Sequence, residues 1–165
     1  FGLVGSEMCI RDRAKPFVET AMRLGAPVRS LAQQASMPIK SVLAGEGVIG
    51  EHSLGQFVEL ASKHNGCEQI GYLTALDHPI TSTGQLGGMA ITLAESLREI
   101  LQIFTREVVT ESNHCDYRLI TRDEETWFSR GLVFEGHGAD WLAEQYVLAF
   151  VIQIIRLPDY PYCSA

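Results

Sequence analysis

The chain has 165 residues, of which 46% are hydrophobic and 20% are charged, and its formal net charge is −7. This length and composition are typical of one globular domain with a hydrophobic core and leave no room for two large domains. The acidic balance excludes attraction to DNA or to an anionic membrane through net charge alone. The longest apolar run, residues 147–155, is interrupted by Gln153 and is far shorter than the roughly 20 residues that a membrane-spanning helix needs.

The first 13 residues, FGLVGSEMCIRDR, have no helical or strand period and fit neither a secretory signal nor a basic arm. Back-translation of residues 3–13 resembles the read-through of a tagmentation sequencing adapter that ends in the transposase mosaic end. We therefore interpret residues 1–13 as adapter-derived and not native. Residues 14–165 are then a single domain, and we expect it to be a fragment of a longer protein.

Three cysteines remain once the first 13 residues are set aside: Cys67, Cys115 and Cys163. They are scattered along the chain without the paired spacing of a disulfide scaffold. This usage is typical of a protein in the reducing cytoplasm.

The first half of the chain predicts several short helices, because apolar residues recur at helical spacing between glycines and prolines. The predicted helices are one through Phe17, Ala21 and Leu24 that ends at Gly25, one from Val28 to Ala35, one from Pro38 to Gly45, one from the N-cap Ser53 to a point before Gly66, and a short one at Ile70 and Leu73. The stretch TSTGQLGGM, residues 81–89, is a Gly-rich link.

The second half predicts a helix, a hairpin and a second helix. Thr92 and Glu95 form a T-x-x-E capping box, which opens a helix to about Val109. Alternation of apolar and polar residues then predicts two antiparallel strands, 115–119 and 127–134, joined by a polar link at residues 122–124. The segment 139–157 predicts one long helix, apolar on almost every side and therefore buried. We predict an α+β fold with a helical N-terminal half, then a helix, an antiparallel β-hairpin and a long buried helix.

A metal site could be drawn from His64, Cys67, His114 and Cys115. Adjacent His and Cys residues on a strand rarely face the same metal ion, and His64 has a simpler role beside a helix C-terminus. We therefore predict no metal site and no cofactor.

The sequence contains no recognisable catalytic motif. It lacks a G-x-S-x-G element, and the glycines of TGQLGGM lack the lysine of a phosphate-binding loop. The carboxylates of residues 123–125 fall in the predicted hairpin turn, where solvation is the simpler interpretation than acid–base chemistry. We predict that the chain is not an enzyme and name no catalytic residue.

The stretch SLAQQASMPIKSVLAG, residues 30–45, resembles a helix-turn-helix motif. Its second helix offers only Lys40 and Ser41 as donors, and Glu46 follows. DNA binding requires several basic contacts, so two packed helices within a helical subdomain are the preferred interpretation, with DNA binding by residues 29–45 as an alternative.

Aromatic residues in the second half are candidates for a ligand site. Trp127 lies in the hairpin, and Trp141 and Tyr146 lie in the last helix. Such residues usually pack in the core, but a small-molecule pocket between hairpin and helices would also use them. Trp127, Tyr146 and Trp141 are our predicted ligand-binding residues.

Four segments in order resemble one family, the N-terminal effector domain of AraC/XylS-type transcriptional regulators in the arabinose-binding-like branch. GAPVRSL and HSLGQFVELA stand in the places of its G-x-P-V-x-x-L helix pair and its P-L-x-x-x-x-F-L-E-x-A helix. The resemblance continues through LAESLREILQIFTREV, the hairpin ending in ETWFSR, and WLAEQYVLAFVIQIIRL, and covers nearly all of residues 16–157. The family's C-terminal helix-turn-helix domain has no counterpart here.

The resemblance implies a bacterial cytoplasmic sensor that binds a small effector and thereby changes how the missing domain binds promoter DNA. It also implies that this fragment does not bind DNA itself, and a homodimer is compatible with it. A small stand-alone enzyme of unknown reaction is the alternative from another class. No effector-contacting residue can be carried over from the family.

Overall fold

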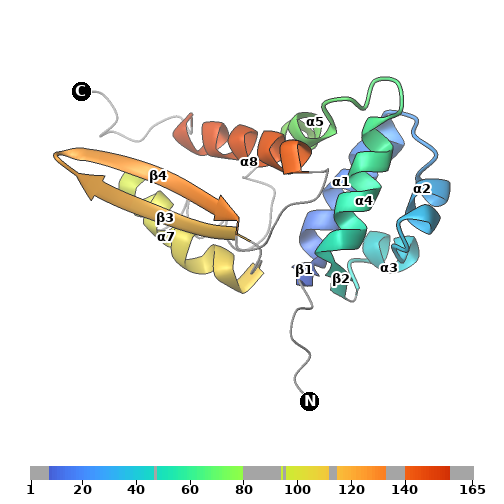
Figure 1. Cartoon of the computed structure of the whole chain (residues 1–165), viewed down its shortest axis with the longest axis horizontal. Coiled ribbons are helices and arrows are strands. Elements are labelled where there is room, and N and C mark those ends of the chain that lie inside the picture. The colour runs from blue at the N-terminus through green and yellow to red at the C-terminus, as the bar shows by residue number, and fades with distance from the viewer. Residues whose placement is uncertain are drawn as a thin grey trace, which may run out of the picture.

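The computed structural model describes residues 8–46, 48–79, 94, 96–111, 115–132 and 140–156. Short helices come first, and a helix, an antiparallel hairpin and a long helix follow, so the predicted α+β class is confirmed. The helical part (Figure 1) consists of β1 (Met8–Ile10), α1 (Arg11–Arg23), α2 (Val28–Gln34), α3 (Ile39–Ala44), β2 (Val48–Gly50), α4 (Glu51–Ser62) and α5 (Ile70–Asp77). The remainder consists of α7 (Leu97–Glu111), β3 (Cys115–Arg122), β4 (Glu125–Leu132) and α8 (Asp140–Ile155).

The predicted apolar faces form the core of the helical part. Val18 from α1, Phe57 from α4 and Ile70 from α5 are fully buried in one cluster. Gly25 and Gly45 end their helices with positive φ values of 81° and 69°, a backbone conformation that glycine adopts without a steric penalty. The N-terminal periodicity was therefore sufficient to place these helices.

Two helix starts differ from the sequence prediction. Helix α4 begins at Glu51, two residues before the predicted N-cap Ser53, because β2 leads directly into it at Gly50. Helix α7 begins at Leu97, and the Ser96 hydroxyl accepts a hydrogen bond of 3.2 Å from the Glu99 backbone N–H. Ser-x-x-Glu is the same capping pattern that was predicted one turn earlier. Thr92 and Glu95 of that earlier box, the Gly-rich link and Pro158 lie outside the described residues.

Part of the segment that was set aside as adapter-derived contributes to the structure. Residues 8–10 form β1, which pairs antiparallel with β2 in the register Cys9 to Ile49, and residues 11–13 form the start of α1. Strand pairing uses backbone groups that every non-proline residue carries. The pairing is therefore compatible with either origin of the segment.

The predicted antiparallel hairpin forms, but its strands extend further towards the turn than predicted: β3 continues to Arg122 and β4 begins at Glu125. Strands β3 and β4 pair from Cys115 with Leu132 to Arg122 with Glu125, so the loop has only two residues. These residues, Asp123 and Glu124, both have positive φ, 47° and 70°. Two positive values are typical of a type I′ turn, whose twist matches that of paired strands.

One face of the hairpin packs on α7 through aromatic rings. Tyr117 and Phe128 stack with ring centroids 5.8 Å apart, and Phe104 of α7 lies 5.2 Å from Tyr117 in an edge-on arrangement. Arg98 of α7 also donates to Thr121 and Thr126, at 3.2 and 2.5 Å, near the turn. Side chains alternate along a strand, so the opposite face of the hairpin points away from α7.

Helix α8 connects the two parts (Figure 1). Leu142 and Tyr146 in its first half belong to the core of the helical part, and Phe150 and Ile154 in its second half pack with α7 and the hairpin. Tyr146 lies where the two cores meet: its ring is tilted against Phe17 at 5.1 Å and stacked on Phe150 at 5.5 Å.

The composition of α8 predicted burial on almost every side, and this prediction is wrong. Leu148, Ile152 and Ile155 are exposed on one face. In a two-layer arrangement, neighbouring elements cover a single face of a helix. The described elements pack against the opposite face of α8 and leave this one uncovered. No helix among the described residues combines the length and apolar character needed to cross a membrane.

Helices α5 and α8 approach closely at Gly71. A β-carbon at this position would overlap the Leu142 carbonyl oxygen and lie 3.1 Å from the Gln145 β-carbon. One turn further, the Gln153 amide donates a 2.6 Å hydrogen bond to the Ala75 carbonyl oxygen. Ala75 lies in the last turn of α5, where carbonyl groups have no partner within the helix.

Replacement of Gly71 with alanine is expected to destabilise the chain, because the added methyl group must separate α5 from the α8 backbone. Overpacking of this kind costs about 1–3 kcal/mol. Gly131→Ala is the matched control, since the nearest atom to its new β-carbon lies 3.9 Å away. Urea unfolding of both variants measures the difference, and equal free energies of unfolding would contradict the close contact.

The hairpin turn can be improved. Left-handed backbone costs a residue with a β-carbon roughly 1–2 kcal/mol, and Asn-Gly is the preferred type I′ pair. The double variant Asp123→Asn, Glu124→Gly is therefore expected to raise the free energy of unfolding by about 1 kcal/mol. The double variant Asp123→Asn, Glu124→Ala removes the same two carboxylates but keeps the β-carbon at position 124, and should show a smaller gain in thermal unfolding. A gain equal to that of the glycine-containing variant would assign the effect to charge.

Candidate functional site

An open hollow lies on the hairpin, lined from the outer face by Ile120, Arg122, Trp127 and Ser129 and also by Phe128 and Arg130, which alternate onto the face towards α7. It is about 470 Å³ in volume, within the size range of small-molecule sites. Its lining is mixed, with apolar, aromatic and basic side chains: Ile120, Arg122, Trp127, Phe128, Ser129 and Arg130. Ile120 and Trp127 are directly paired across the two strands, and we refer to this site as the hairpin hollow.

Trp127 presents most of its side chain to solvent at this site, with 61% exposed. A large aromatic side chain gains free energy when its surface is removed from water. The neighbouring Ile120 is half-buried and extends the apolar surface on the same face. Together they provide a flat surface on which an apolar ring can stack.

The three arginines on or beside this surface differ in their partners. Arg118 forms an ion pair with Asp116, whose carboxylate hydrogen-bonds to the guanidinium and raises the pKa of Arg118 further. Arg130 is paired with Glu144 of α8. Within the described part of the chain, the Arg122 side chain has neither an ion pair nor a hydrogen bond. Arg122 is therefore the cation in the hairpin hollow that can accept an anionic group.

Arg130 links the hairpin hollow to the rest of the molecule. Its side chain is only 11% exposed; one guanidinium nitrogen pairs with the Glu144 carboxylate, and Nε donates to the Tyr117 hydroxyl at 3.2 Å. The guanidinium also lies 5.9 Å from the centre of the Tyr117 ring, within the range of a cation–π contact. Arg130 therefore connects this end of β4 to α8 through an ion pair.

The structure separates the three predicted ligand-binding residues. Trp127 lines the hairpin hollow, but Tyr146 is half-buried between core rings and Trp141, 65% exposed, lies at the start of α8. Trp127 does not share a wall with Tyr146 in this structure, because strand alternation turns Trp127 to the outer face. Ligand binding by the three residues stays a prediction. Arg122 and Ile120 were missed, although the R-x-I-x-R alternation along β3 is visible in the sequence.

Cys67 is poorly suited to be a ligand of the metal site that could be drawn from His64, Cys67, His114 and Cys115. Cys67 is fully buried, and burial, together with the charge of Glu68, raises the pKa of its thiol, which disfavours the thiolate that binds metal. His114 and the Cys115 side chain lie outside the described residues. Among those that are described, no group of three or more His, Cys, Asp or Glu side chains could hold a metal ion.

The helix-turn-helix alternative has little surface for DNA. Helices α2 and α3 form in this stretch, and Ala35, in the turn that follows α2, is fully buried. Helix α3 is only six residues long, and Val42 is buried in the core. Lys40 is exposed, but it is the only basic side chain on this helix.

Comparison with known proteins finds no match to a family model, to a curated protein or to a solved structure. A function for the chain is therefore inferred from the residues of the hairpin hollow.

Removal of the Glu144 carboxylate is expected to destabilise the chain, because it leaves the nearly buried Arg130 guanidinium without its counter-charge. Hydrogen bonds to charged groups contribute about 1.5–3 kcal/mol, so Glu144→Ala should lower the free energy of unfolding by that order. Glu125→Ala, at an exposed position beside the turn, should change it little. Denaturant unfolding would contradict the role of this pair if both variants gave the same value.

Proposed function

We propose that this chain is the ligand-sensing domain of a bacterial AraC-type transcription regulator. In this proposal, a small effector binds the domain and controls a DNA-binding domain in another part of the protein. The observation that carries the proposal is the hairpin hollow, where an exposed tryptophan adjoins an arginine whose side chain has no partner among the described residues. Helices α2 and α4 also form where the family resemblance requires them, from GAPVRSL and HSLGQFVELA.

The chemistry of the hairpin hollow favours one class of effector. Trp127 and Ile120 offer a flat apolar surface, and Arg122 offers a guanidinium that binds carboxylates with two parallel hydrogen bonds. A small aromatic carboxylate satisfies both. A neutral aromatic compound would leave Arg122 unpaired, and a small polar anion would leave Trp127 exposed to water.

A signal from this site can travel through Arg130. This arginine lines the hairpin hollow and is ion-paired with Glu144 of α8. A ligand shifts a conformational equilibrium only by the difference between its affinities for the two states. We propose that the two states differ in the position of β4 relative to α8, and that the effector favours one of them.

Binding of phenylacetate tests the proposed site, with phenylacetamide as the neutral probe. Titration calorimetry should detect binding of phenylacetate, and Arg122→Ala should weaken it about 10- to 100-fold, the equivalent of one lost charge-assisted hydrogen-bonded pair. Trp127→Ala should weaken it as well. Arg118→Ala and Trp141→Ala are the matched controls, since one arginine is already paired and the other tryptophan lies on α8. Equal losses in Arg122→Ala and Arg118→Ala would contradict this site.

The regulatory part of the proposal has a separate test. The gene from which the chain derives can be recovered and sequenced in full. Two helix-turn-helix motifs with a basic balance downstream would support an AraC-type regulator. A full-length reading frame without them would refute the regulator and leave the ligand site standing.

A further inference from the structure

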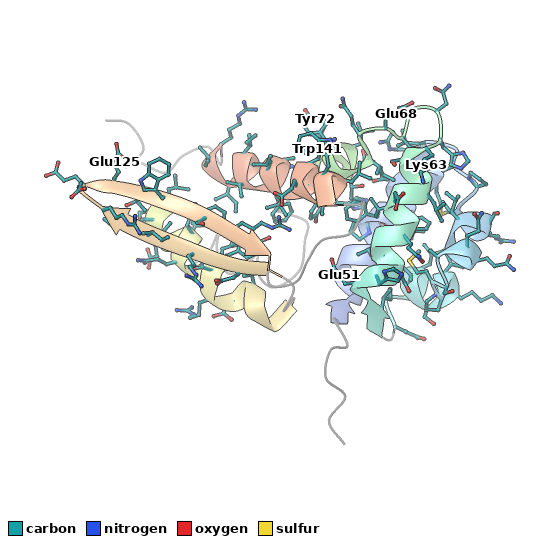
Figure 2. The ribbon with its side chains drawn as sticks, in the orientation of Figure 1. Glu51, Lys63, Glu68, Tyr72, Glu125 and Trp141 are labelled. Atoms are coloured by element: carbon teal, nitrogen blue, oxygen red, sulfur yellow. The ribbon has the colours of Figure 1, made fainter. Side chains whose placement is uncertain are left out.

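Two opposite charges stand beside each other at the turn end of the hairpin hollow. Arg122, which lines the hollow, lies directly across from Glu125 in the register of β3 and β4. Figure 2 shows Glu125 at the tip of the hairpin, and both side chains are exposed. Directly paired residues of two antiparallel strands have β-carbons about 4.5–5.5 Å apart on one face. A cation and an anion therefore border the same small volume.

Neither of these two charges has a partner in the part of the chain that the structure describes. Arg118 and Arg130, the other arginines of the hairpin, are each ion-paired. Arg122 and Glu125 form no ion pair with each other and no side-chain hydrogen bond with any described residue. A ligand with a single charge satisfies only one of them. A carboxylate on Arg122 would lie beside the carboxylate of Glu125, and an amine on Glu125 would lie beside the guanidinium.

The apolar part of the site lies one step further from the turn. Ile120 and Trp127 are paired with each other, two residues along their strands from Arg122 and Glu125. Two residues of a strand span about 7 Å and return to the same face. The charged pair and the apolar pair therefore follow each other on one surface, at a spacing that one small molecule can cover.

We infer that the effectors of this site are aromatic α-amino acids. Such a molecule carries its carboxylate and its ammonium group on one carbon, so it meets Arg122 and Glu125 together. The guanidinium binds the carboxylate with two parallel hydrogen bonds, and the Glu125 carboxylate accepts a hydrogen bond from the ammonium group. A single methylene joins that carbon to the aromatic ring, which then lies against Trp127.

This inference rests on the proposed effector site and makes its ligand more specific. It assigns to Glu125 the selection of a zwitterion over a simple carboxylate. Arg122 and Trp127 bind the carboxylate and the ring in either case.

Titration calorimetry with three probes that share one skeleton tests the inference. L-phenylalanine has both charges, hydrocinnamate lacks the ammonium group, and phenethylamine lacks the carboxylate. The chain is expected to bind L-phenylalanine about 5-fold more tightly than hydrocinnamate, the equivalent of one exposed charge pair. Phenethylamine should bind most weakly, because its cation would lie beside Arg122.

The variant Glu125→Gln keeps the size of the side chain and removes its charge. It should lower the affinity for L-phenylalanine about 5-fold. The affinity for hydrocinnamate should stay the same or rise, because the repulsion between two carboxylates is removed. Glu124→Gln is the matched control, since Glu124 lies in the turn outside the paired strands, and it should keep the preference for L-phenylalanine.

Failure of this inference and failure of the effector site give different results. Equal binding of L-phenylalanine and hydrocinnamate, or the same change of preference in Glu125→Gln and Glu124→Gln, would overturn the role of Glu125 and leave the carboxylate site standing. Binding of neither probe at concentrations up to about 5 mM would refute the hairpin hollow as an effector site, and the inference with it.

Discussion

The close contact of α5 with α8 is the constraint on which the remaining structure depends. Gly71 has no side chain, so the Leu142 carbonyl can lie directly against α5, and the Gln153–Ala75 hydrogen bond joins the two helices again one turn further along α5. The contact has a cost. Thr74 Oγ1 and Gln145 Oε1 are buried without a hydrogen-bond partner in the described part of the chain, at roughly 1–3 kcal/mol each. The apolar contacts of α8 must outweigh this penalty.

The position of α8 determines what the hairpin can present. Tyr146 and Phe150 carry the core from the helical part to α7 and the hairpin, and the ion pair with Glu144 fixes Arg130 at the end of β4. With the inner face of the hairpin committed to these contacts, its outer face is left to display Trp127. The same helix presents its uncovered apolar face, with Leu148, Ile152 and Ile155, to solvent.

The sequence contained enough information for the elements but not for the site. Helical and strand periods predicted α1, α4, α7 and the hairpin, because local spacing determines which face of an element is apolar. The sequence could not show that Gly71 lies at a helix crossing, because nothing in the segment IGYLTALD indicates which helix packs against this glycine. Nor could it separate Trp127 from Tyr146, because strand alternation gives two faces without saying which one the helices cover. The exposed face of α8 was missed for the same reason: apolar residues all round a helix indicate burial only if enough neighbours exist.

The central claim is that α8 joins the helical part and the hairpin into one cooperative unit. Native-state hydrogen exchange at increasing urea concentration tests it most directly, because it reports the opening free energy of each amide separately. The account predicts that the most protected amides of α1 and α4 and those of β3 and β4 converge on one common free energy of unfolding. Two separate values, with the hairpin amides exchanging through an opening that leaves α1 and α4 protected, would contradict it.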